Sequence, residues 1–373
     1  MNCVSFSAES KIISNAPYTH EVKEQHLSPK SFDATLAKPL PKVSLIVLPE
    51  ARQKGIDQKS DPFISFIDRA KKEIVMASYK LQEKKLPEAE MLHALKRASE
   101  RGVKIHLIAE NRLTKMEEVA SSAPVKKGDS LKAYEQRGVN VYHVSSMFDQ
   151  SHTKFIVIDR KEALIGSTNF DKEPEGHKDN ARPSRDFAIR TAHPEIIEEL
   201  LKGFWSDAKG SSIVHKSKNL LWGPAGQRKK IEELIHHAEN SIRIYQQDFT
   251  DLKVLEALLQ AVKNGVHVEL IMSPHPFGFN RPDNNTENQK RLEEVGGRVY
   301  LTNQVNVHAK VLIIDDRILY IGSTNFYQPS IDKNRNVGLL TQDQKLIAEV
   351  LAVFKKDKQS AESASSIPTL AID

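Results

Sequence analysis

Short apolar runs alternate with amphipathic segments along the chain from residue 43 onward. Segments at 61–72 and 88–101 repeat apolar residues at the helical period, and the second stops before Gly102, a common residue after a helix. Strands alternating with helices predict an α/β sheet layered between helices. The apolar runs that we predict as strands lie at 43–49, 73–79, 103–109 and 139–144.

The later part of the chain repeats this order of segments. Residues 230–242 match residues 63–75 in pattern, and 259–268 match 96–105. We therefore predict an internal duplication that extends over most of the chain. Each copy closes with one more strand and helix, at 185–191 with 195–207 and at 335–341 with 344–358.

The two ends of the chain lack sustained periodicity. Residues 1–41 are rich in Ser, Lys, Glu and Pro, and 359–373 are rich in Ser and Ala. Such composition is typical of segments that do not bury enough apolar surface to fold. We predict a flexible leader at 1–41, a first half at 42–210, a second half at 211–358 and a disordered tail at 359–373.

One polar pattern of twenty residues occurs twice with identical spacing. Apolar runs flank a polar turn at Asp159 or Asp315, which predicts a buried β-hairpin in each half. Side chains alternate faces along a strand, so each His and Lys should share one face, and the Gly should allow a tight bend. The matched residues are His152, Lys154, Asp159, Gly166, Ser167 and Asn169, and His308, Lys310, Asp315, Gly322, Ser323 and Asn325.

These residue types suit the cleavage of a phosphodiester. Its negative charge repels anionic attackers, whereas a neutral imidazole can attack phosphorus and form a covalent intermediate. Lysine and asparagine side chains can hold the non-bridging oxygens, and a second histidine can protonate the leaving oxygen near neutral pH. The two copies of the pattern therefore predict one shared site.

Both copies fit H-x-K-x(4)-D-x(6)-G-S-x-N, and the chain thereby resembles the phospholipase D superfamily. The resemblance implies two α/β/α sandwich halves about a pseudo-twofold axis, with the active site at their seam. It implies a phosphohistidine intermediate, no metal and no cofactor, and a monomer would suffice for one site. The residues implied are His152, His308, Lys154 and Lys310 as catalytic, and Asn169, Asn325, Ser167 and Ser323 as phosphate-binding. For Asp159 and Asp315 we predict a structural role, since turn aspartates commonly bond local backbone.

The halves differ in the acidic residue that usually orients a histidine in this superfamily. The first half supplies Asp186 after its motif, whereas the matching position in the second half is Asn336. The resemblance suggests that these partners reach across the seam, Asp186 to His308 and Asn336 to His152. Because a carboxylate favours a protonated imidazole and an amide does not, we predict His152 as the nucleophile and His308 as the general acid.

Composition leaves the substrate open. The net charge of +5 suits phosphate-rich partners, but anionic lipid surfaces and nucleic acids attract a basic protein equally. The resemblance favours an enzyme that hydrolyses or transfers phospholipid head groups at a membrane surface. The alternative is a metal-independent nuclease that cleaves DNA or RNA with the same site.

The lengths of the apolar runs predict a protein without a membrane-spanning segment. No apolar run approaches the roughly 20 residues that span a bilayer, and the first residues carry no apolar signal segment. Cys3 is the single cysteine, which excludes an intramolecular disulfide. We expect a cytoplasmic or peripheral membrane location, and export by another route stays open.

Overall fold

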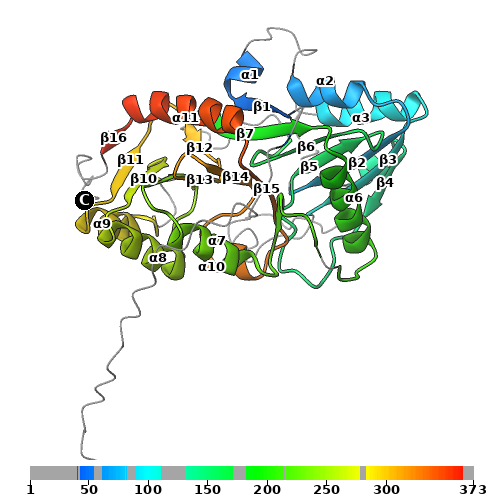
Figure 1. Cartoon of the computed structure of the whole chain (residues 1–373). Coiled ribbons are helices and arrows are strands. Elements are labelled where there is room, and N and C mark those ends of the chain that lie inside the picture. Colours follow the sequence, from blue (N-terminus) through cyan, green and yellow to red (C-terminus); the bar gives the residue numbers. More distant parts are fainter. Residues whose placement is uncertain are drawn as a thin grey trace, which may run out of the picture. The chain divides into compact units, whose positions relative to one another are not determined.

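Two mixed β-sheets, one from each half of the chain, carry the segments that form the site (Figure 1). The computed structural model describes residues 40, 43–53, 61–79, 81, 90–110, 131–170, 182–213, 215–277 and 283–363. Both sheets belong to one compact unit, residues 34–373. The leader predicted at 1–41 lies outside the described residues except for Leu40.

The two sheets have the same strand order. The first runs β1-β7-β6-β5-β2-β3-β4, and the second runs β8-β15-β14-β13-β9-β10-β11 before ending in β16. The first-half strands are β1 (Val43–Leu48), β2 (Glu73–Ser78), β3 (Lys104–Ala109), β4 (Val139–Tyr142), β5 (Phe155–Ile158), β6 (Glu162–Gly166) and β7 (Ser184–Thr191). The later strands are β8 (Leu220–Trp222), β9 (Ser241–Tyr245), β10 (His267–Met272), β11 (Arg298–Leu301), β12 (Asn306–Val307), β13 (Val311–Ile314), β14 (Ile318–Gly322), β15 (Val337–Thr341) and β16 (Glu362–Ser363).

Helices cover both faces of each sheet (Figure 1). Those of the first half are α1 (Glu50–Gln53), α2 (Pro62–Asp68), α3 (Glu90–Glu100), α5 (Lys132–Glu135) and α6 (Pro194–Ala208). Those of the second are α7 (Gln227–His236), α8 (Leu252–Lys263), α9 (Thr286–Glu294), α10 (Gln328–Asp332) and α11 (Gln344–Gln359). In Figure 1, α2 and α3 lie across the first sheet from α6, while α7, α8 and α9 lie across the second sheet from α11. The predicted α/β fold with two similar halves is confirmed.

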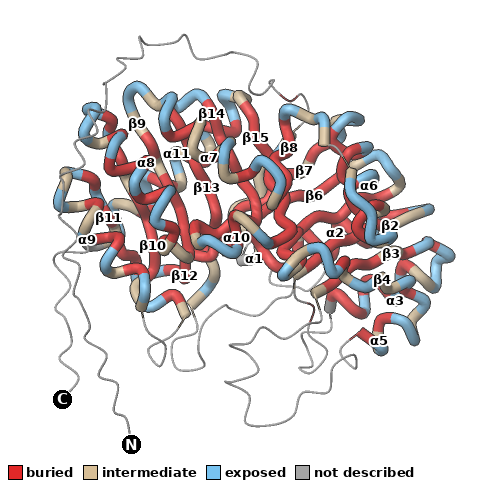
Figure 2. The backbone as a smooth tube through the Cα atoms, turned by 90° about the horizontal axis from the view of Figure 1, so that it is seen from below, coloured by how far each residue is buried: buried red, intermediate tan, exposed pale blue. Residues whose placement is uncertain are grey.

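One hydrophobic core joins the halves. A single cluster of buried side chains includes residues of β2, β5, α6, β9, β13 and α11, and the strands are buried along most of their length (Figure 2). Phe155 of the first half lies 6.3 Å from Trp222 of the second between ring centroids, and Phe187 lies 5.5 Å from Tyr245. Since burial of one such side chain contributes about 1.5–3 kcal/mol, separation of the halves would be costly.

The starts of two predicted segments differ in the structure. The strands β5 and β13 begin one residue after Lys154 and Lys310, so each His/Lys pair precedes the strand instead of lying within it. The first residues of the predicted tail are structured, because α11 extends to Gln359 and β16 pairs with β11, and residues 364–373 lie outside the described residues. Within the described parts of the chain, no helix combines the length and the hydropathy that crossing a bilayer requires.

The motif glycines serve a close approach of strands and not the predicted tight bend. Neither has a positive φ. A Cβ atom at Gly166 would lie 2.3 Å from the Phe187 carbonyl oxygen, and one at Gly322 would lie 2.5 Å from the Gly338 Cα atom. A side chain at either position would push β7 or β15 away from the hairpin.

The hairpin aspartates fasten each motif hairpin to the strand beside it. Asp159 accepts hydrogen bonds from the backbone N–H groups of Lys71, Lys72 and Glu73 at 2.7–3.1 Å. Asp315 repeats the arrangement with residues 239–241 at 2.7–2.9 Å. The partner backbone is distant in sequence and not local as predicted, so these carboxylates fix the position of β2 and β9 at the far end of each hairpin.

We expect Asp159→Ala to lower the free energy of unfolding by about 2 kcal/mol, because charged hydrogen bonds are lost and Ala is strained at a φ of 52°. Asp159→Asn keeps an acceptor oxygen and tolerates positive φ, so it should cost about half as much. Urea unfolding of both variants checks this. Equal losses in the two would show that the carboxylate's bonds are not what stabilises the turn.

Candidate active site

Each motif histidine is held by a strand of the opposite half. The short strand β12 pairs with β7, and the His308 N–H donates to the Arg185 carbonyl oxygen at 3.2 Å. The mirror contact is the bridge between Ser151 and Arg335, where the His152 N–H donates to the Arg335 carbonyl oxygen at 2.7 Å. These crossed backbone bonds bring both histidines to the seam between the sheets.

Two carbonyl-type acceptors orient the His152 ring. Its Nδ1 lies 2.7 Å from the Ser323 carbonyl oxygen and 3.3 Å from Asn336 Oδ1. The Ser330 carbonyl oxygen orients the Asn336 amide by accepting a hydrogen bond from its Nδ2 at 2.7 Å. Because a backbone carbonyl only accepts, Nδ1 carries the proton, and in the neutral ring Nε2 keeps its lone pair.

A carboxylate orients the His308 ring. The Nδ1 atom of His308 lies 3.0 and 3.1 Å from the two carboxylate oxygens of Asp186. Both side chains are buried, with exposed fractions of 4% and 2%. A buried carboxylate in this position stabilises positive charge on the ring. The partners across the seam are thus those that the sequence suggested for each histidine.

The electrostatic surroundings keep His152 neutral. Burial lowers the pKa of His152 well below its usual range, and the nearby charges of Lys154, Lys310 and His308 lower it further. The Ser323 carbonyl oxygen opposes this effect. The crossed backbone bonds bring both motif copies to one seam, so charges of the second copy, on Lys310 and His308, act on the His152 pKa.

The motif lysines are completely buried beside their histidines. The Lys154 ammonium donates to the His152 carbonyl oxygen at 3.1 Å, and Lys310 donates to the His308 carbonyl oxygen. Lys154 also lies 5.1 Å from the centroid of the Tyr79 ring, and Lys310 donates to Gln247 Oε1 at 3.4 Å. Two buried cations at one seam make it suited to an anion.

The motif serines and asparagines follow the returning strands of the hairpins. Asn169 and Asn325 are each 7% exposed. Ser167 Oγ donates to Asp186 Oδ1 at 2.5 Å, and Ser323 Oγ donates to Asn336 Oδ1 at 2.8 Å. A hydroxyl has one proton to donate, so direct phosphate binding by these serines would require that bond to break. This geometry favours an indirect role, in which the serine positions the side chain that orients the histidine.

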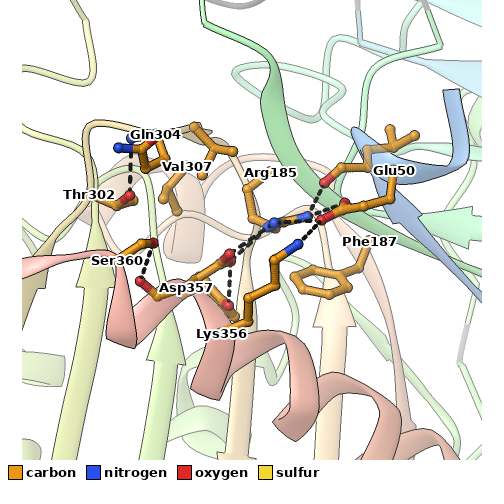
Figure 3. Close-up of polar contacts among 12 residues, drawn as sticks. Glu50, Arg185, Phe187, Thr302, Gln304, Val307, Lys356, Asp357 and Ser360 are labelled. Atoms are coloured by element: carbon orange, nitrogen blue, oxygen red, sulfur yellow. Dashed lines mark hydrogen bonds and ion pairs between the residues drawn. The ribbon is translucent and has the colours of Figure 1, made fainter. Parts of the chain in front are cut away.

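Buried ion pairs lock the strand ends that hold the histidines. The Arg185 guanidinium lies between Asp357 of α11, at 2.7 Å, and Glu50 of α1, at 2.5 Å (Figure 3). In the mirror position, Arg335 pairs with Asp207 of α6 at 2.9 Å and donates to His215 Nε2 at 3.1 Å. Each arginine therefore ties its strand to a helix of the opposite half.

The sequence reasoning missed these arginines and two residues at the strand ends, Tyr79 and Gln247. A signal was available for the ion pairs, because Arg185 and Arg335 precede Asp186 and Asn336, and an Asp follows each at the same offset. Tyr79 and Gln247 carried no such signal. Only the position of β2 and β9 beside the hairpins brings them to the lysines.

A family model described as "Cardiolipin synthase, PLD-like domain" matches residues 63–208 and 231–358. The chain is 27% identical to the minor cardiolipin synthase ClsB of Bacillus subtilis (strain 168) over 301 residues, which cover 73% of this chain and 72% of that protein. It is 26% identical to cardiolipin synthase A of Pseudomonas syringae over 258 residues, covering 64% of this chain and 53% of that protein.

Two solved structures share the fold. The phosphatidylserine synthase of Haemophilus influenzae Rd KW20 superposes with a TM-score of 0.64 at 14% identity, covering 88% of each chain. The polyphosphate kinase of Porphyromonas gingivalis superposes with a TM-score of 0.61 at 16% identity, covering 84% of this chain and 50% of that one. At such low identity these likenesses concern the fold alone.

We expect Asp207→Asn to lower the free energy of unfolding by about 3 kcal/mol, because Arg335 keeps a buried charge without a carboxylate. The matched variant Asp357→Asn should cost only about 1–2 kcal/mol, since Glu50 still pairs with Arg185. Urea unfolding of the two variants measures both losses. An equal or larger loss for Asp357→Asn would contradict the assignment.

We expect the His152 imidazole to stay neutral well below pH 6.5, which NMR titration of labelled histidine measures. Asn336→Asp should raise the His152 pKa, because a carboxylate stabilises the imidazolium. As pH falls through about 6.5, residue 152 binds a proton in the unfolded chain but stays neutral in the folded protein. The free energy of unfolding should therefore decrease in acid. His152→Gln identifies the resonance, and a His152 that titrates normally and ignores Asn336→Asp would refute the prediction.

Proposed function

The chain belongs to the phospholipase D superfamily, in the family of cardiolipin synthase PLD-like domains, and we propose that it transfers the phosphatidyl group of a glycerophospholipid to an alcohol through a covalent phosphohistidine. The observation that carries this proposal is the pairing of two unlike imidazoles at one seam. His152 has an amide and a carbonyl at Nδ1, and His308 has a carboxylate.

In the first step, Nε2 of neutral His152 attacks phosphorus and the bond from phosphorus to the head-group oxygen breaks. His308, protonated beside Asp186, gives its proton to that leaving oxygen. In the second step, the acceptor hydroxyl attacks phosphorus, its proton passes to His308, and the bond from phosphorus to nitrogen breaks. The protein returns to its starting protonation state.

The buried ammonium groups of Lys154 and Lys310 stabilise the charge on the non-bridging oxygens in both steps. We assign Asn169 and Asn325 the same task as neutral donors. Because these groups are already fixed by the fold, little reorganisation is needed as the charge develops. Asp186 and Asn336 act as positioning residues through the histidines, with Ser167 and Ser323 behind them.

The relatives support phospholipid over nucleic acid, and transfer over hydrolysis. Two curated relatives are named as cardiolipin synthases, and cardiolipin contains two phosphatidyl groups joined through one glycerol. An acceptor alcohol on a second phospholipid is therefore the natural partner of the phosphoenzyme. Because this chain covers 53–72% of those two proteins, we extend the chemistry and not every property of the relatives.

The test incubates the purified protein in EDTA with phosphatidylglycerol vesicles and, separately, with DNA and RNA. We expect new phosphatidyl-alcohol products by mass spectrometry, with His236→Ala on the exposed end of α7 as a matched control that keeps full activity. His152→Ala and His308→Ala should abolish turnover. Cleavage of nucleic acid without any lipid product would establish the nuclease alternative instead.

A second measurement separates the roles of the two histidines. A p-nitrophenyl phosphodiester has a leaving group that needs no protonation, so His308→Ala should still form phosphoenzyme with it, whereas His152→Ala should not. With the phospholipid, loss of the general acid should cost about 10²–10⁴-fold in rate. Phosphate trapped on residue 308 of the His152→Ala variant would reverse the assignment.

A further inference from the structure

The two strand ends that reach the site differ in chemistry. Beyond β2, the Tyr79 ring lies 4.5 Å from the His152 ring between centroids. Beyond β9, the matching residue is Gln247, which accepts from Lys310 at 3.4 Å, and Asp248 follows it. The His152 side is therefore lined by an aromatic ring, whereas the Gln247 amide lies beside Lys310 on the other side, with Asp248 next to it in the chain.

The segment that holds Asp248 is fixed to the second motif. The Phe326 N–H donates to the Asp248 carbonyl oxygen at 3.0 Å, and the Thr250 N–H donates to the Phe326 carbonyl oxygen at 2.9 Å. Thr250 Oγ1 also donates to Asp248 Oδ1 at 2.8 Å. These bonds attach the loop after β9 to the end of the second motif and hold the half-buried Asp248 carboxylate against Thr250.

Charged and titratable groups face Asp248 from several elements. Burial raises the pKa of Asp248 to about 6, while Thr250 and Lys310 lower it and Asp283 raises it. Tyr327, which follows the second motif, is near enough for Asp248 to raise its pKa, although burial is the larger cause. The Lys310 ammonium repels a cationic ligand and the carboxylate repels an anionic one, so a neutral hydroxyl group suits this position best.

The direction of attack on phosphorus places the head group on the His308 side of the site. In phosphoryl transfer, the attacking and leaving atoms lie roughly in line on opposite faces of phosphorus. If His152 attacks, the leaving oxygen, and later the acceptor hydroxyl, lie toward His308 and its neighbour Lys310, which donates to Gln247, the residue before Asp248. This step rests on the function proposed above.

We propose that Asp248, with Gln247, forms a subsite that accepts hydrogen bonds from the neighbouring hydroxyl groups of a polyol head group or acceptor. Asp248 is then a specificity-determining residue that selects glycerol-like alcohols over alcohols with a single hydroxyl. A site built to bond a hydroxyl discriminates strongly against an analogue that lacks it, because the buried acceptor is left unpaired.

The experiment compares two acceptors of the same carbon number. Phosphatidylglycerol vesicles are incubated with the full chain and equal concentrations of deuterated glycerol and 1-propanol, and mass spectrometry gives the ratio of labelled phosphatidylglycerol to phosphatidylpropanol. The variants are Asp248→Val, which removes the acceptor, and Asp248→Asn, which keeps the shape and one acceptor oxygen. Asp283→Asn removes a neighbouring charge and is the control.

We expect Asp248→Val to lower the glycerol-to-propanol ratio about tenfold or more, with the propanol rate within about threefold of wild type. The ratio of Asp248→Asn should fall between those of wild type and Asp248→Val, and Asp283→Asn should keep the wild-type ratio. An unchanged ratio in both Asp248 variants overturns the subsite and leaves the proposed function standing. If the wild type forms neither of these products nor cardiolipin, both proposals fail, whereas cardiolipin without either product overturns the subsite alone.

The pH dependence of the ratio gives a second readout. Steps that both acceptors share, including proton transfer by His308, cancel in the ratio. With wild type, the preference for glycerol should weaken as pH falls through about 6, because the protonated carboxyl is a poorer acceptor. With Asp248→Val the ratio should not change over that range. A wild-type ratio that is constant between pH 7.5 and 5 would count against the subsite.

Discussion

The crossed pairing of each motif segment with the opposite half is the constraint on which the site depends. The backbone N–H groups of His152 and His308 donate to the carbonyl oxygens of Arg335 and Arg185, at strand ends of the opposite half. The same strand ends supply Asn336 and Asp186 to the two imidazoles. Neither half alone contains a histidine together with the group that orients it, so the site is complete only when the two halves are packed together.

The strand ends that hold the histidines carry buried arginines, and burying these charges costs free energy. Each arginine therefore has a carboxylate partner. Arg185 and Arg335 are almost completely buried, and each pairs with a carboxylate on a helix of the opposite half. Removing ions from water costs several kcal/mol each, which only close pairing and further hydrogen bonds offset. The ion pairs therefore hold the strand ends in register, while the shared apolar core supplies most of the stabilisation.

The departure from symmetry gives the two histidines different chemistry on one scaffold. An amide at His152 and a carboxylate at His308 occupy equivalent positions, and the strand ends add Tyr79 on one side and Gln247 with Asp248 on the other. A duplicated fold provides two sets of matched backbone positions around one active site. Single substitutions at matched positions can then assign a different electrostatic environment, and so a different task, to each copy.

The sequence by itself determined the alternation of strands and helices, the duplication, the two hairpins and the identity of the motif residues. Those features depend on periodicity, on spacing within about twenty residues, and on the recurrence of the same spacing later in the chain, all of which can be read from the order of residues. It also indicated the partners Asp186 and Asn336, through a resemblance and not through local pattern. The tertiary structure alone decided that the glycines permit close strand contact, that the serines bond the orienting side chains, and that Tyr79 and Gln247 reach the lysines. These contacts join segments up to about 75 residues apart within one half, and their geometry follows from how neighbouring strands pack in each sheet, which no local propensity encodes.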